Sequence, residues 1–441
     1  MTAALRRLLR LLVLCPMLVC AAATPAQAIA RSCAWTVQIT GDQVNALYPD
    51  EAAKYWIAIV PLPAGGRAVL HGRFPHARYT SINTYTTQTQ AIDAIHDAQV
   101  TPDPGSSNPF TFGGNRRAAA RAYTVAVVKG QIPAQGRAPN TIYTKNADGS
   151  KEGTNAAIAL RIYRPDRGLD IDGGVPLPSV TTYAPDGTRL VSYPDCPDTS
   201  LPDIGQTPTL ANAGLGAGVT GGPSVFAQNP PAWHRYINTQ TALADMVTDN
   251  EVTGPTVRPP LVGITSTAFP SGGFGENIDN KYVYATFSRQ LGAVLVLRGR
   301  LPTFPRTYAG QPRMGRGQLR YWSLCTENQA TQYYACATDD QVPVDDAREF
   351  TIMVSATANR PANATTGCGV AWLPAGPAPQ ATMLLRNMLP APSFAQAIQR
   401  VQPGREAEQM GAYYPRGTYY PTAIAAERAV GCARAPVRRG R

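Results

Sequence analysis

Short segments in which apolar and polar residues alternate recur along most of this chain. Ala68–Arg73 and Ala122–Val128 are two of them. A period near two places successive side chains on opposite faces of a β-strand, so these segments predict strands. Asp148-Gly149 and Asp186-Gly187 predict tight turns between strands. The pattern is typical of a protein built mainly from short strands.

Helical periodicity is scarce by comparison. One longer helix is predicted over Pro231–Val247, and short helices are predicted near Tyr48–Tyr55 and Ser393–Val401. The 40 prolines and 39 glycines are turn formers and interrupt any longer helix. The sequence therefore predicts an all-β fold with few short helices.

The chain contains two copies of one unit. Lys54–Pro75 aligns without gaps onto Lys281–Pro302, and Arg78–Asp103 aligns without gaps onto Arg320–Asp345. Identity over two such blocks indicates an internal duplication. Recurring pairs include Gly72/Gly299, Arg73/Arg300, Arg78/Arg320, Tyr79/Tyr321, Asp97/Asp339, Gln99/Gln341 and Asp103/Asp345, and Tyr123–Val125 matches Phe350–Ile352.

The copies differ in their loops. The second copy has an insertion around Phe304–Gln318, and the first copy is longer around Pro104–Ala120. We predict a first domain over residues 29–200 and a second over residues 276–432. Residues 201–275, which hold the predicted longer helix, are rich in Pro, Gly and Thr and are expected to connect the two.

Three short motifs carry a resemblance to a known group. They are Asn280-Lys281-Tyr282, Arg298–Pro302 and Arg320–Ser323. The chain resembles, over most of residues 45–430, the bacterial tandem families labelled domains of unknown function 1254 and 1214. The resemblance implies two tandem jelly-roll (β-sandwich) domains and self-association as a homotrimer. It implies no activity.

The start of the chain has the features of an export signal. Three arginines before residue 11 precede an apolar run of about 13 residues, Leu11–Ala23, which is too short to span a bilayer as a helix. An A-x-A motif ending at Ala28 predicts cleavage there. Residues 1–28 are thus predicted to be a Sec-type signal peptide of a secreted protein without a membrane span, although Cys20 leaves a lipid-anchored form open.

Six cysteines follow the signal peptide, and an even number in an exported chain predicts disulfides. They are Cys33, Cys196, Cys325, Cys336, Cys368 and Cys432. Cys325 and Cys336 are expected on facing strands of one hairpin and therefore to pair. The pairing of the other four stays open.

The net charge of +11 overstates the charge of the folded part. Without the three arginines of the signal peptide it is about +8, and four more arginines lie in residues 433–441, which we expect to be a disordered tail. The remaining charge is mild, so no nucleic acid partner is expected. The basic tail either is simply solvated or contacts an anionic polymer of the cell envelope.

Polar residues that recur in both copies are expected to serve the shared fold. We predict structural roles, as a hydrogen-bonded corner or a paired charge, for Arg73, Asp97, Gln99, Arg300, Asp339 and Gln341. The glycines before Arg73 and Arg300 are expected to mark a strand bulge or bend. Asp97 with Asp103 would also suit acid and base catalysis on a glycan, which is the competing interpretation.

Metal and cofactor motifs are weak. No H-x-H pair, nucleophile elbow, phosphate loop or dinucleotide fingerprint is present, and no cofactor is expected. Asp170–Gly173 and Asn146–Gly149 resemble calcium loops faintly but lack the remaining ligands. The histidines are His71, His76, His96 and His234, and those of the first copy are replaced in the second.

Residues present in one copy only are better candidates for function. Flat rings beside arginines suit stacking on sugars or gripping an extended polymer, and the competing interpretation is that they pack a sheet end or a subunit interface. The candidate ligand-binding residues are His71, His76, Arg306, Trp322, Tyr413, Tyr414, Arg416, Tyr419 and Tyr420.

These patterns favour a secreted, non-catalytic protein with a ligand-binding or assembly role at the cell envelope, with a glycan or envelope polymer as its partner. An extracellular hydrolase acting on glycans or envelope polymers is the first alternative. A metal-dependent small-molecule enzyme is the second.

Overall fold

The computed structural model describes residues 33–40, 48–86, 90–153, 155–196, 227–235, 275–328 and 332–432. The predicted signal peptide, the tail from residue 433 and most of the connector lie outside the described residues. So do residues 236–247 of the predicted longer helix.

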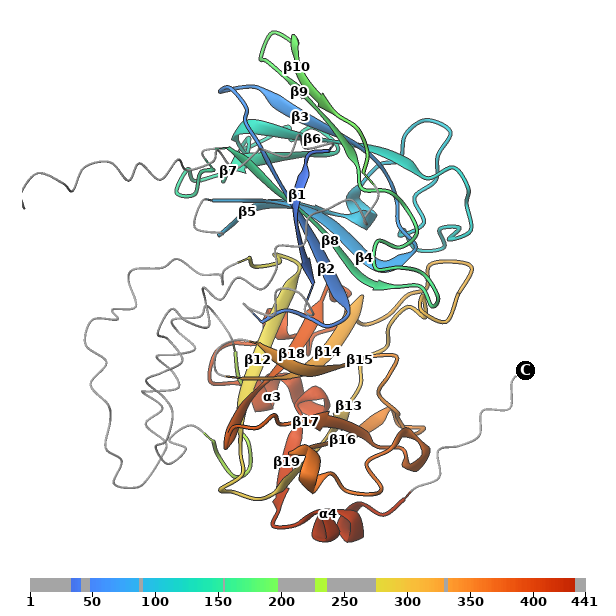
Figure 1. Cartoon of the computed structure of the whole chain (residues 1–441), viewed down its shortest axis with the longest axis vertical. Coiled ribbons are helices and arrows are strands. Elements are labelled where there is room, and N and C mark those ends of the chain that lie inside the picture. The colour runs from blue at the N-terminus through green and yellow to red at the C-terminus, as the bar shows by residue number, and fades with distance from the viewer. Residues whose placement is uncertain are drawn as a thin grey trace, which may run out of the picture. The chain divides into compact units, whose positions relative to one another are not determined.

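The first half of the chain forms two five-stranded sheets with the strand orders β1-β2-β8-β4-β5 and β10-β9-β3-β6-β7. Their strands are coloured blue to green in Figure 1. The bounds are β1 Trp35–Thr40, β2 Ala53–Val60, β3 Arg67–Arg73, β4 Ala77–Tyr85, β5 Ala91–His96, β6 Ala122–Gln131, β7 Thr141–Lys145, β8 Ala156–Pro165, β9 Ser179–Tyr183 and β10 Arg189–Tyr193.

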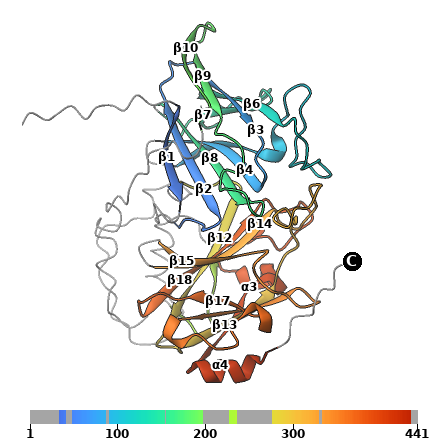
Figure 2. The same ribbon diagram turned by 45° about the vertical axis from the view of Figure 1, so that its right-hand side comes forward.

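The second half repeats this arrangement with the strand orders β11-β12-β18-β14-β15 and β17-β16-β13-β19, coloured yellow-green to red in Figures 1 and 2. The bounds are β11 His234–Arg235, β12 Asn280–Ser288, β13 Val294–Arg300, β14 Tyr321–Glu327, β15 Tyr333–Thr338, β16 Glu349–Ser355, β17 Ala371–Pro374, β18 Gln380–Met388 and β19 Arg416–Tyr420. The helices are short: 3₁₀ turns at Asp97–Gln99, Thr357–Asn359, Thr366–Cys368, Ile398–Arg400 and Gly411–Tyr413, and α3 Glu406–Met410 and α4 Ala423–Val430.

The two halves match strand for strand. The first nine strands occupy the same places in their sheets as β11–β19, and β10 is an additional edge strand of the first half. The prediction of an all-β chain with two tandem sandwiches is confirmed. Each sandwich contains one parallel pair, β6 with β7 and β16 with β17, whereas a jelly roll is antiparallel throughout. Because this departure occurs in both halves, it belongs to the duplicated unit.

Each half has its own apolar core and its own disulfides. Trp35 and Trp56 are fully buried in the first core, and Trp322 is fully buried in the second. Cys325 pairs with Cys336 across β14 and β15, as the hairpin prediction required. The other bridges, Cys33–Cys196 and Cys368–Cys432, close long loops within the first and second halves respectively.

Gly72 and Gly299 do not mark a bulge, because both lie in uninterrupted strand pairing opposite an aromatic residue. A Cβ on Gly72 would approach the ring of Tyr123 to 2.6 Å, and a Cβ on Gly299 would approach the ring of Phe350 to 3.1 Å. Glycine thus avoids a clash at position 72 and a tight contact at position 299, because the ring of the facing residue lies across the backbone.

The predicted short helices are largely wrong. Tyr48–Tyr55 forms a turn followed by the start of β2. Within Ser393–Val401 only Ile398–Arg400 is helical, as a single 3₁₀ turn. The first residues of the predicted longer helix are extended and include β11, whose neighbour Trp233 is buried and donates from Nε1 to the Pro415 carbonyl at 2.8 Å. Tertiary burial of an aromatic ring has overridden a weak local preference.

The two halves contact each other through a reciprocal set of buried ion pairs. Arg78 of the first half donates to both carboxylate oxygens of Asp339 in the second, at 2.9 and 2.8 Å. Arg320, the counterpart of Arg78, donates to Asp97, the counterpart of Asp339, at 2.8 Å. The repeated arginine of each half thus pairs with the repeated aspartate of the other half, which is the pattern of an isologous dimer interface.

The same reciprocity extends to a second pair of arginines. Arg161 on β8 donates to the backbone carbonyls of Gly275, the last residue of the connector, and of Glu276, the first residue of the second half. Arg386 occupies the matching place on β18 and donates to the carbonyls of Tyr48 and Pro49 at 2.7 and 3.1 Å. Tyr79 and Tyr321, also counterparts, each donate across the contact, to Asn277 and Asp50 respectively. The halves are therefore joined as the two subunits of a dimer would be.

Candidate functional site

The two loops that distinguish the copies pair with each other. Gly113 in the longer loop of the first copy donates its N–H to the Met314 carbonyl at 2.9 Å, and Met314 donates back to Gly114 at 2.9 Å. Arg116 N–H donates to the Pro312 carbonyl at 3.0 Å. In Figure 1 the light blue loop of the first half and the gold loop of the second meet on one side of the molecule. The short ladder places segments about 200 residues apart side by side.

Buried arginines hold these loops in place from beneath. The Arg116 guanidinium donates to the carbonyls of Thr307 and Gln311, at 3.3 and 3.0 Å, and pairs with Asp166. Arg78 donates from Nε to Thr307 Oγ1 at 2.6 Å. The backbone carbonyls of the inserted loop are thereby satisfied, so the loop can be ordered without being part of a sheet.

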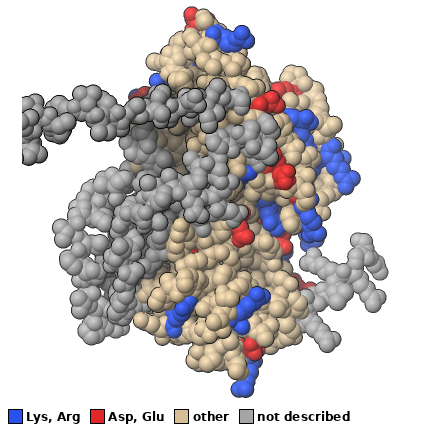
Figure 3. All heavy atoms as spheres, in the orientation of Figure 1, with Lys and Arg blue, Asp and Glu red and all other residues tan. Residues whose placement is uncertain are grey.

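Exposed arginines cover the outer side of the paired loops and the adjoining turns. They are Arg73, Arg117, Arg167, Arg306, Arg313 and Arg316. Within the described part of the chain, no carboxylate lies at ion-pair distance from any of the six. Figure 3 shows Lys and Arg side chains on this side of the molecule, with Asp and Glu side chains among them. The six arginines thus lie on a surface of mixed charge, but they are not held in ion pairs.

Two aromatic rings lie among these arginines. Phe112 is 64% exposed, and the Arg316 guanidinium lies over it, 3.8 Å from the ring centroid. Arg164 and Arg167 lie over Tyr308, with the guanidinium carbons at 3.8 and 5.2 Å from the centroid. Stacking on a ring holds a guanidinium in a defined plane. We call the six exposed arginines together with Phe112 and Tyr308 the basic loop face.

The two candidate histidines lie beside this face. His76 is half-buried, and burial, with help from Arg121 and Arg116, lowers the pKa of its imidazole. His71 is exposed on β3, two residues before Arg73 and on the same side of the strand, with Nδ1 3.0 Å from Thr124 Oγ1. Of the predicted ligand-binding residues, the structure thus brings His71, His76 and Arg306 to one region.

The remaining candidates lie elsewhere and mostly pack the fold. Trp322 is 2% exposed against Phe350, so its ring presents no face to a ligand. Tyr419 is buried, and Tyr413 and Tyr420 pack partly against the core clusters of the second half. Tyr414 is also half-buried, and its hydroxyl accepts from Trp233 N–H at 2.9 Å. Arg416 is exposed at the start of β19. The tyrosine-rich end is thus mainly a packing element.

The predicted structural residues have defined partners. The Gln99 side chain accepts from the backbone N–H of His96 at 3.0 Å and closes the 3₁₀ turn that follows β5. The Gln341 side chain accepts from the backbone N–H of Thr338 at 2.9 Å and closes the matching turn that follows β15. Arg73 donates to the Ala119 carbonyl, and Arg300 lies 3.9 Å from Glu349. Neither of these arginines pairs with the repeated aspartates as expected, because Arg78 and Arg320 of the opposite halves take that place.

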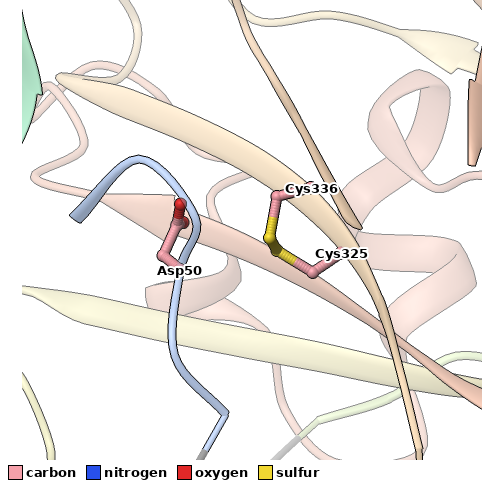
Figure 4. Close-up of side chains that lie close together, drawn as sticks. All are labelled: Asp50, Cys325 and Cys336. Carbon is pink, nitrogen blue, oxygen red and sulfur yellow. A yellow bond between two sulfur atoms is a disulfide. The ribbon is translucent and has the colours of Figure 1, made fainter. Parts of the chain in front are cut away.

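One buried group of potential metal ligands is present among the described residues. It consists of Asp50, Cys325 and Cys336, shown in Figure 4. The sulfur atoms are joined in a disulfide, so they offer no thiolate. Asp50 instead accepts from Tyr321 and from Ser323, the latter at 2.7 Å. This donor set fits a structural anchor rather than a metal centre.

Next to it lies an unusual carboxyl group. Glu327 is fully buried, and burial raises its pKa to about 8 even though Arg386 lies 3.2 Å away and acts in the opposite direction. Its second oxygen has no hydrogen-bond partner. The corresponding place in the first half holds Tyr85, whose hydroxyl accepts from Arg161. Arg386, which pairs with Glu327, also donates to the Tyr48 and Pro49 carbonyls of the first half, so Glu327 belongs to the contact between the halves.

Sequence reasoning missed most of the basic loop face. Phe112, Arg117, Arg313 and Arg316 were not among its candidates. The signal that points to them is the mismatch of the copies, because all four lie in the two segments that lack a counterpart.

Comparisons with known proteins found similarity only to solved structures of low sequence identity. No family model matches the chain, and no curated protein matches it. A crystal structure of an uncharacterised protein from Burkholderia cenocepacia is similar, with 13% identity, 81% of this chain and 79% of that chain covered, and a TM-score of 0.42. A protein from Vibrio parahaemolyticus is similar with 10% identity, 85% and 91% covered, and a TM-score of 0.35. The resemblance to the two tandem families and the trimer that it implies stay predictions.

Proposed function

We propose that this protein is an exported, non-catalytic binding protein that holds a glycan or envelope polymer on its basic loop face. The observation that carries this proposal is the pairing of the two loops by which the copies differ. A duplicated fold preserves what both halves need, whereas segments unique to each half are free to serve a ligand. Here the unique segments lie together and present exposed arginines and rings.

The carboxylates that would serve a hydrolase are engaged elsewhere. Asp97 and Asp339 are both fully buried in ion pairs between the halves. Asp103 accepts from Thr124 Oγ1 at 3.2 Å. A general acid must reach the glycosidic oxygen of its substrate, so two buried carboxylates on different sides of a domain contact do not support that chemistry.

The setting of the protein is consistent with an envelope partner. All six cysteines after residue 28 form disulfides, which are typical of proteins outside the reducing cytoplasm. Within the described ranges, no helix is long and apolar enough to cross a membrane.

Retention of the mature chain on a panel of immobilised envelope polysaccharides tests the proposal. We expect binding to at least one polymer, with Phe112→Ala weakening it about three- to tenfold because an exposed ring that stacks on sugars is lost. Ile424→Ala is the matched control, because Ile424 is 59% exposed on α4, away from this face. Equal loss in both variants, or release of reducing sugar by the wild type, would contradict the proposal.

A further inference from the structure

Resting on the proposed function, we infer that the basic loop face selects an anionic polysaccharide, one that carries carboxylate, phosphate or sulfate groups along its length. Six exposed arginines lie on this face, and no described carboxylate lies at ion-pair distance from any of them. Guanidinium groups that are not held in ion pairs can pair with the oxyanions of a ligand.

The geometry favours oxyanions that are spaced along a polymer. The arginines come from four segments: the end of β3, the loop before β6, the turn after β8 and the inserted loop after β13. A single small anion would reach one or two of them, whereas an extended chain would reach several at once. The planar guanidinium pairs with carboxylate or phosphate through two parallel hydrogen bonds, and the stacking of Arg316 and Arg167 on rings fixes that plane.

The face is suited to a sugar backbone between the charges. Phe112 is exposed beside Arg316, so a pyranose ring can stack on the phenyl ring while its acidic substituent meets the guanidinium. A membrane surface is less well matched, because the face consists of loops and has no amphipathic helix to lie among the headgroups. Nucleic acid is a poor match for a chain with three disulfides, since such chains belong outside the cytoplasm.

The test compares polygalacturonate with its methyl ester, which has the same backbone without the charge. The test variant is Arg117→Gln with Arg306→Gln and Arg316→Gln. The control variant is Arg189→Gln with Arg298→Gln and Arg428→Gln, which removes the same charge from exposed arginines at other places in the fold. Unchanged melting curves for both variants ensure that binding, not folding, is compared.

We expect the wild type to bind polygalacturonate at least about tenfold more tightly than its ester, and the test variant to lose about tenfold while the control loses little. Added salt should weaken the wild type more than the test variant. Equal binding of the ester would overturn the anionic selectivity and leave glycan binding intact. Binding of neither form, with binding to single-stranded DNA or to phosphatidylglycerol vesicles instead, would overturn both proposals.

Discussion

At the scale of single residues, the reciprocal ion pairs join the same residue types in two different environments. Both side chains of the Arg78–Asp339 pair are fully buried, whereas Arg320 in the Arg320–Asp97 pair is 12% exposed. Removing one member of a buried pair leaves an uncompensated charge, which costs about 3–5 kcal/mol. The cost should be smaller where water reaches the partner.

We therefore expect Asp339→Asn to destabilise the protein by about 3 kcal/mol or more, and Asp97→Asn to destabilise it by clearly less. Urea denaturation of both variants at one pH measures the difference. Equal destabilisation would indicate that the residual exposure of Arg320 is unimportant. Loss of a catalytic activity in Asp97→Asn without loss of stability would contradict the structural role altogether.

Glu327 should make stability depend on pH. Its pKa is raised to about 8 in the folded protein, above the value of about 4.3 expected in the unfolded chain. The folded state therefore favours the protonated form. Its contribution to stability is present in full below the unfolded pKa and is lost as the pH rises through about 8.

Glu327→Gln should accordingly flatten the fall of the melting temperature between pH 5 and about pH 8. Glu349→Gln is the control, because Glu349 is exposed. Melting temperatures measured across this range give the answer. A wild-type melting temperature that rises with pH, and a Gln variant that does not alter the slope, would contradict the assignment.

Recurrence in both copies identified Asp97 and Asp339 as candidates for the fold, but it assigned them the wrong arginines. An alignment of the two copies identifies the repeated residues. It does not show whether the ion-pair partner of a residue lies in the same copy or in the other copy. Arg78 and Arg320 were visible as repeats, yet their pairing across the halves depends on how the sandwiches meet. The placement of one sandwich against the other is tertiary information, and the local sequence pattern does not contain it.

At the scale of elements, the strands around Ala68–Arg73 and Ala122–Val128 were predictable because half-buried strands alternate. β8 and β18 were not recognised as counterparts. Both are central strands that are buried on both faces, so their sequences are mainly apolar and lack a distinctive alternating pattern. The repeat there survives in topology and in one arginine each, Arg161 and Arg386, and not in enough identities to align.

Gly72 offers a test of the strand packing. Gly72→Ala should destabilise the first half by about 1–3 kcal/mol, because its Cβ would meet the Tyr123 ring at 2.6 Å. Gly299→Ala should cost less, since the corresponding distance is 3.1 Å. Gly130→Ala in β6 is the control, with its nearest contact at 3.6 Å. Chemical denaturation measures all three, and equal effects would refute the ring-over-glycine packing.

At the scale of the whole molecule, the contact between halves resembles that of a dimer whose subunits have been fused. No disulfide joins the halves, since each of the three bridges lies within one of them. The basic loop face exists only when they are together, because the ladder takes one loop from each half. The alignment of the copies identified both loops, 104–120 and 304–318, as segments that differ between the halves. Nothing in the sequence indicated that these two loops contact each other.

A protease site inserted within residues 201–226 tests this organisation. After cleavage of the folded protein we expect the halves to stay associated in size-exclusion chromatography, and to separate more readily when Asp339→Asn is introduced. Separation of the cleaved wild type under mild conditions would show that the reciprocal contacts do not hold the halves together.

Amide hydrogen exchange of the mature protein with and without polygalacturonate tests whether both loops form one binding face. We expect the polymer to protect backbone amides in residues 111–117 and 306–316 together, and to leave residues 411–420 at the tyrosine-rich end unchanged. Protection confined to residues 411–420, or protection of one loop without the other, would contradict a binding face assembled from both halves.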